Sequence, residues 1–183
     1  HFLYNGISDA VENMENANEH RCYYLFDTYG RRLTDIPLSY HEMADYNVLV
    51  VSNVDNAAIS QSLMQRIDYF VREMGGTMLV TGGEFAYERG NYEKGILGDL
   101  MPVVPGEPFS MKRLTPAQPL TPEPAYEALL STGDGEPCIK WMHDFASVKD
   151  GAQVMARRGD LPAMVIAERG KGHVIAFAGS PLG

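Results

Sequence analysis

The chain has 183 residues, 45% of them hydrophobic, and this length suits one domain with a well-buried core (residues 1–183) rather than two. Its formal net charge of -9, from 24 acidic and 15 basic residues, excludes a nucleic-acid partner, because phosphate binding needs clustered Lys and Arg. No apolar run approaches the about 20 residues that span a bilayer, so we predict no membrane insertion. The two cysteines lack ligand spacing and suit a cytoplasmic location.

The first predicted elements are a helix and a strand. Apolar residues between Ile7 and His20 recur at three- and four-residue steps, which is the period of a helix with one buried face. The apolar and aromatic run Cys22–Phe26 then predicts a strand. An earlier strand is indicated at Phe2–Tyr4, before the helix.

The middle of the chain predicts a strand–helix–strand unit. Two aliphatic runs, Asn47–Ser52 and Thr77–Thr81, are typical of strands buried on both faces. Between them, Ser60 can cap a helix that ends at Gly75-Gly76. This βαβ succession predicts an α/β fold with a mostly parallel sheet and helices on both faces.

Two later segments complete the predicted architecture. The segment 102–124 is rich in proline, and we expect it to wrap the surface as extended segments and turns. Further on, the runs 163–167 and 173–177 flank the glycines of Glu168–Gly172. This pattern predicts an antiparallel C-terminal hairpin that extends the sheet.

The candidate binding site lies in the loops that follow the two buried strands, because open α/β sheets bind ligands beyond the carboxyl ends of their strands. The first loop, Ser52–Asn56, contains Asn53 and Asp55. The second begins at Gly82-Gly83, whose backbone N–H groups can face an anion or a carbonyl oxygen. Polar and aromatic side chains follow that turn and suit a small polar molecule: Glu84, Tyr87, Glu88, Arg89, Asn91 and Tyr92.

The sequence gives less support to a catalytic or metal-binding site than to a binding loop. Trp141–Asp144 places a His beside an Asp, but neighbouring residues of a strand point to opposite faces, so a partly buried aromatic strand is the preferred interpretation. No GxSxG or GxCxG elbow occurs, and Cys138 near His143 lies in a turn-like stretch, which disfavours a Cys/His dyad. The remaining histidines are isolated from one another, so we predict no metal and no cofactor.

Five stretches carry a resemblance to a known family: 45–51, the helix 60–74, 75–83, Gly90–Tyr92 and 97–103, the last ending in Leu-Met-Pro-Val. With the closing Pro162–Val165 and Gly170–Val174, they resemble the glutamine amidotransferase-like proteins of the class I amidotransferase superfamily. The resemblance implies a flavodoxin-like three-layer sandwich. It does not imply glutaminase chemistry.

Catalytic members of that superfamily carry a cysteine at the tight turn after the central strand, and a His and a Glu after a late strand. Here the turn is Thr81–Phe85, and Ala178–Gly183 follows the late strand without a His or a Glu. The leading hypothesis is therefore a non-catalytic domain that binds a small polar ligand or a partner at the two loops.

Two alternatives stay open. The first is a hydrolase or isomerase on a carbohydrate-like substrate, with Glu84 as acid or base and Tyr87 or Arg89 holding the substrate. The second is an assembly module, which is either a homo-oligomer that packs through the Gly170–Gly172 hairpin or a domain of a longer receptor-like chain.

Overall fold

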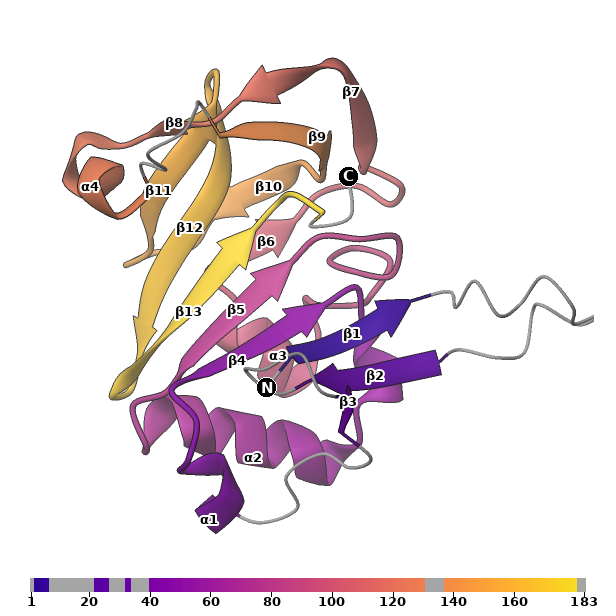
Figure 1. Cartoon of the computed structure of the whole chain (residues 1–183), viewed down its shortest axis with the longest axis vertical. Coiled ribbons are helices and arrows are strands. Elements are labelled where there is room, and N and C mark those ends of the chain that lie inside the picture. Colours follow the sequence, from indigo (N-terminus) through magenta and orange to yellow (C-terminus); the bar gives the residue numbers. More distant parts are fainter. Residues whose placement is uncertain (1, 7–21, 27–31, 34–39, 131–136, 181–183) are drawn as a thin grey trace, which may run out of the picture.

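The computed structural model describes residues 2–6, 22–26, 32–33, 40–130 and 137–180. They form an α/β structure built on a nine-stranded sheet, with helix α2 (Gln61–Arg72) lying along one side of it in Figure 1. In spatial order the strands are β3 (Arg32–Leu33), β2 (Cys22–Phe26), β1 (Phe2–Gly6), β4 (Val48–Ser52), β5 (Thr77–Thr81), β13 (Gly172–Phe177), β12 (Leu161–Arg169), β11 (Gln153–Arg158) and β8 (Thr121–Pro122).

Parallel strands form the centre of this sheet. The neighbours β1, β4, β5 and β13 pair in parallel, and the predicted strands at Cys22–Phe26, Asn47–Ser52 and Thr77–Thr81 are confirmed. Antiparallel pairings extend the sheet on both sides, through β2 and β3 at one end and β12, β11 and β8 at the other. A short turn such as that between β12 and β13 can join only antiparallel strands.

Helix α2 forms where its capping residues predicted it. The Leu63 N–H donates to Ser60 Oγ at 3.3 Å, which satisfies one of the free N–H groups at the helix start. Beyond its end, Gly75 has a φ of +80°, a conformation that costs glycine little. The buried side of the helix, including Ile67 and Phe70, packs in the main hydrophobic core.

The two faces of the central sheet are covered differently. Side chains of one face, such as Met78, Val80 and Val174, are fully buried in the core that contains residues of α2 and α3 (Gly95–Leu100). Their neighbours in sequence point to the second face and are only half-buried, as Leu79 and Ile175 are. The helix predicted between Ile7 and His20 lies outside the described residues.

The C-terminal hairpin of β12 and β13 is confirmed. Its turn lies against the end of α2: the Lys171 N–H donates to the Arg72 carbonyl at 2.8 Å. A Cβ on Gly172 would lie 2.2 Å from the Gly76 carbonyl oxygen. The glycine therefore allows two backbones to approach closely.

The proline-rich segment is extended, as predicted, and much of it is exposed. It contains β8 and two further strands that form separate two-stranded sheets. These pairs are β6 (Val103–Pro105) with β10 (Phe145–Val148), and β7 (Lys112–Pro119) with β9 (Cys138–Met142). Figure 1 shows them beyond the carboxyl ends of β5 and β13.

Four short helical segments complete the described part of the chain: α1 (Tyr40–Met43), η2 (Asn56–Ala58), η3 (Pro124–Tyr126) and α4 (Glu127–Leu130). Among the described residues, we find no helix with both the length and the hydrophobicity of a membrane span.

Candidate functional site

The carboxyl ends of β5 and β13 are covered by the chain that follows β9. The Gly82 N–H donates to the Gly179 carbonyl at 2.8 Å, and the His143 N–H donates to the Ala178 carbonyl at 3.0 Å. These backbone bonds place the His143 side chain directly against the Gly82-Gly83 turn, where sequence analysis placed the centre of the site.

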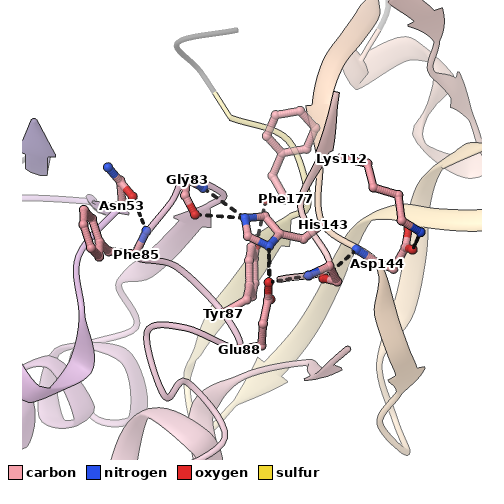
Figure 2. Close-up of polar contacts among 10 residues, drawn as sticks. Asn53, Gly83, Phe85, Tyr87, Glu88, Lys112, His143, Asp144 and Phe177 are labelled. Carbon is pink, nitrogen blue, oxygen red and sulfur yellow. Dashed lines mark hydrogen bonds and ion pairs between the residues drawn. The ribbon is translucent and has the colours of Figure 1, made fainter. Parts of the chain in front are cut away.

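The His143 imidazole lies at the centre of a buried polar cluster (Figure 2). Its Nδ1 is 3.1 Å from each carboxylate oxygen of Glu88, and its Nε2 is 3.2 Å from the Gly83 nitrogen and 3.0 Å from the Gly83 oxygen. Because an ionised carboxylate only accepts, Nδ1 carries a hydrogen. Nε2 then either accepts from the Gly83 N–H, in the neutral ring, or donates to the Gly83 carbonyl, in the cation.

Glu88 is the charged partner in this cluster, and its side chain is only 4% exposed. Burial by itself would raise the pKa of its carboxyl, but the hydrogen bond and charge of His143, the backbone N–H of Glu88 itself and the Ser110 side chain lower it, and the net pKa lies below its ordinary value. The Ser110 N–H donates to Glu88 Oε1 at 3.1 Å. Glu88 thus ties the loop after β5 to two other loops, one containing Ser110 and one containing His143.

The Gly82-Gly83 turn has no room for a nucleophilic side chain. A Cβ on Gly82 would lie 2.7 Å from the Ala178 oxygen and 2.8 Å from His143 Cδ2. A Cβ on Gly83 would lie 2.5 Å from the side chain of Asn53. The two glycines are therefore explained by close packing.

Two tyrosines of the predicted site, Tyr87 and Tyr92, have no exposed surface. The Tyr87 hydroxyl donates to the Phe177 carbonyl at 2.7 Å, its ring packs on the His143 ring, and burial raises its pKa well above the ordinary value. The Tyr92 hydroxyl donates to the Val54 carbonyl, and burial also raises its pKa. Both side chains hold loops in place beneath the surface.

The polar residues of the predicted site bond other groups of the protein, either in their own loop or in a neighbouring one. Asn53 Oδ1 accepts from the Phe85 N–H at 2.7 Å and so joins the loops after β4 and β5 (Figure 2). Asp55 Oδ1 caps η2 by accepting from the Ala57 N–H at 2.9 Å, and Asn91 Oδ1 accepts from Lys94 Nζ at 2.7 Å.

Backbone strain is concentrated in the same loops. Four non-glycine residues of the described chain have positive φ: Asn53 (53°), Tyr87 (52°), Asn91 (56°) and Phe109 (64°). Asn tolerates this region, but bulky Tyr and Phe rarely adopt it, and such strain of about 1–3 kcal/mol per residue persists only where the surroundings enforce it. These loops are therefore held in a specific shape.

Two residues of the predicted site, Glu84 and Arg89, form a partly exposed surface together with Phe85 and Phe109, which the prediction did not include, and we call it the Arg89 surface. Arg89 pairs with Glu84 at 3.1 Å, and its guanidinium carbon lies 5.4 Å from the Phe85 ring centre and 5.2 Å from the Phe109 ring centre. Phe109 is 75% exposed. A cation held between two aromatic rings with a carboxylate beside it suits recognition at a surface.

The sequence did not reveal the role of His143. His143 and the adjacent Asp144 have different partners: Lys112 Nζ donates to Asp144 Oδ2, and His143 bonds Glu88. Glu88 lies 55 positions away along the chain, so no local spacing pointed to the pair. The described residues contain no cluster of three or more His, Cys, Asp or Glu side chains that could hold a metal.

Comparison with known proteins identifies structural relatives only. No family model and no curated protein matches the chain. A cytoplasmic protein of Salmonella typhimurium is similar at a TM-score of 0.69 with 18% identity over 80% of this chain, and another, from strain LT2, at 0.68 with 22% identity over 79%. The chain spans 65% of the length of each.

A ThuA-like protein of Bacteroides uniformis is similar at a TM-score of 0.55, with 11% identity over 81% of this chain and 66% of its own length. Identities this low show a shared α/β fold and no more.

Proposed function

We propose that this chain is a non-catalytic domain of the class I amidotransferase-like superfamily that binds a small polar ligand or a protein partner through the Arg89 surface. The binding surface is formed by exposed side chains of loops at the carboxyl edge of the sheet. Beneath it, the cluster of His143 and Glu88 keeps these loops in place.

The observation that carries the proposal is the closed Gly82-Gly83 turn. Catalytic members of the superfamily place a cysteine at this position, whereas here an imidazole fills the space that a side chain would need. Both ring nitrogens of His143 bond groups of the protein itself, Glu88 and Gly83. A triad cannot form around a turn that admits no nucleophile.

The Arg89 surface is the part of the carboxyl edge that can meet another molecule. Arg and aromatic residues dominate the binding energy of many interfaces, because they offer large contact areas and charge-assisted hydrogen bonds. Here Phe85 and Phe109 hold the guanidinium in one position, so little conformational entropy is lost when it binds. Among the aromatic side chains whose burial the structure describes, Phe109 is the most accessible, at 75%.

We further propose that residues 1–183 form a single domain, that the protein is cytoplasmic and that its fold is a flavodoxin-like three-layer sandwich. The location is supported by two structural relatives that are described as cytoplasmic proteins. The third layer is supported by the second face of the sheet, whose half-buried apolar residues include Leu79 and Ile175. Apolar strand residues of this kind usually pack against another layer.

The alternatives have less support in the geometry. A catalytic carboxylate is usually buried in a cleft, whereas the Glu84 side chain is 49% exposed. For an assembly role through the Gly170–Gly172 hairpin, the structure offers no specific observation, and its turn already packs against the end of α2.

Two measurements test the proposal. First, the protein should release no ammonia from glutamine, and turnover that is lost on alkylation of Cys138 would contradict a non-catalytic role. Second, thermal shifts should be recorded with glutamine, sugars, sugar phosphates, nucleotides and simple anions, because a ligand that binds only the folded state raises the melting temperature.

A shift that Arg89→Ala removes would support a ligand at the Arg89 surface. Arg113→Ala is the matched control, since Arg113 also lies over an aromatic ring, that of Trp141 at 5.9 Å, but in the β7–β9 sheet. A shift that both variants remove, or that neither removes, would argue against the Arg89 surface.

A further inference from the structure

A cavity of about 220 Å³ opens on the second face of the sheet, over β11, β12 and β13. Its lining includes Gln153, Glu168 and His173 from these strands and Tyr126 from η3. In the strand register His173 lies opposite Thr77, the first residue of β5. The cavity is thus at the amino edge of the parallel strands and is separate from the Arg89 surface at their carboxyl edge.

The strand register shows that the lining side chains share one face. Glu168 lies directly opposite His173 across β12 and β13, and Gln153 lies opposite Ile166 across β11 and β12. Ile166 and Glu168 are two residues apart on one strand, so they point the same way. Three polar side chains and one apolar side chain therefore converge on the cavity.

The polar groups that line the cavity can form hydrogen bonds with a ligand. The Tyr126 hydroxyl donates to Gln153 Oε1 at 2.6 Å, which orients the amide so that its NH₂ group remains as the donor. Within the described ranges, the Glu168 carboxylate and the His173 imidazole have no side-chain hydrogen bond or ion pair. They lie opposite each other in the strand register and both line the cavity, so both can bond a ligand there.

The charge of the lining selects the ligand class. Glu168 is an acceptor and carries the only fixed charge among the lining residues, which include no Lys or Arg. An anion such as a phosphate would be repelled, whereas hydroxyl groups can donate to the carboxylate and accept from the amide of Gln153. The Ile166 side chain offers an apolar wall for the C–H groups of a ring.

We propose that this cavity binds a neutral polyhydroxylated molecule of about the size of one sugar ring. Its volume lies below the roughly 300–1,000 Å³ of sites for larger ligands, which fits a single ring. Such a small ligand gains little binding free energy in total, so we expect a dissociation constant in the millimolar range.

Amide chemical shifts of the ¹⁵N-labelled protein, titrated with D-glucose and with myo-inositol, test this proposal. We expect saturable shifts at Gly151, Gln153, Glu168 and His173 with at least one of the two. Glu168→Gln, which keeps the shape and removes the charge, should weaken binding about tenfold, because hydrogen bonds to charged groups are the strong ones. Asp150→Asn removes an exposed charge outside the cavity lining and should leave the affinity unchanged.

Three results would overturn the proposal. One is the absence of saturable shifts with either polyol. Another is tighter binding of D-glucose 6-phosphate than of D-glucose, because the negative lining predicts the opposite order. The third is a set of shifts confined to the loop 82–92 or insensitive to Glu168→Gln, which would place polyol binding elsewhere. The spectrum of Glu168→Gln also reports whether the variant is folded.

Discussion

Replacement of His143 by Phe tests whether the buried imidazole holds the carboxyl edge together. Phe has a ring of similar size, so packing against Tyr87 can persist, but both ring nitrogens are lost. Glu88 would then keep the Ser110 N–H as its partner while its side chain stays 4% exposed. The Gly83 N–H would lose its acceptor.

The expected cost follows from the uncompensated charge. Removing the partner of a buried charge typically lowers the free energy of unfolding by about 3–5 kcal/mol, and we expect this for His143→Phe because it leaves the Glu88 carboxylate without the imidazole N–H. Glu88→Leu leaves an imidazole N–H without its carboxylate and should cost about 1–3 kcal/mol. The double variant should cost less than the sum of the two, by at least about 1 kcal/mol, because neither partner remains unpaired.

Urea unfolding followed by circular dichroism gives these values from the midpoints, provided that the dependence on urea has the same slope in all variants. Lys112→Ala is the control. It breaks the ion pair with Asp144, but the Lys112 side chain is 62% exposed, and we expect a loss below about 1 kcal/mol. The reasoning is refuted if His143→Phe costs less than about 1 kcal/mol, or if the two single changes are additive.

Further predictions concern acid, packing and a buried hydroxyl. The pKa of the Glu88 carboxyl is lower in the folded protein than in the unfolded chain. Its contribution to the free energy of unfolding is therefore complete above about pH 4.3 and is lost as the pH falls through the folded pKa. In Glu88→Gln, the free energy of unfolding should depend less on pH in this acidic range. Gly82→Ala forces a Cβ to 2.8 Å from His143 Cδ2 and should lower the melting temperature, with a loss of about 1–3 kcal/mol, and an unchanged melting temperature would contradict the clash. Tyr92→Phe leaves the buried Val54 carbonyl without its hydroxyl donor and should cost about 1–3 kcal/mol in urea unfolding; a neutral result would show that the bond adds no stability.

Local patterns in the sequence determined much of the central fold. The aliphatic runs at Asn47–Ser52 and Thr77–Thr81 predicted β4 and β5, and Ser60 and Gly75 marked the ends of α2. These signals are reliable because each depends on neighbouring residues: a central strand of a parallel sheet needs a run of apolar residues, and a helix end needs a cap. Burial on both faces was predicted for these strands, but only one face is fully buried, and Leu79 on the other face is half-buried. The glycines before and after Lys171 identified the hairpin, because a tight turn also depends on the residues that form it.

Tertiary structure alone decided how the carboxyl edge is organised. Gly82-Gly83 looked like an open anion-binding turn, and whether His143 filled it depended on the path of β9, some 60 residues further along. Tyr87 and Tyr92 resembled ligand-stacking residues, but the direction of a loop side chain depends on packing from distant strands, and both are buried. Contacts between residues far apart in sequence leave no periodicity, and this is why the pair of His143 and Glu88 could be identified only in the folded protein.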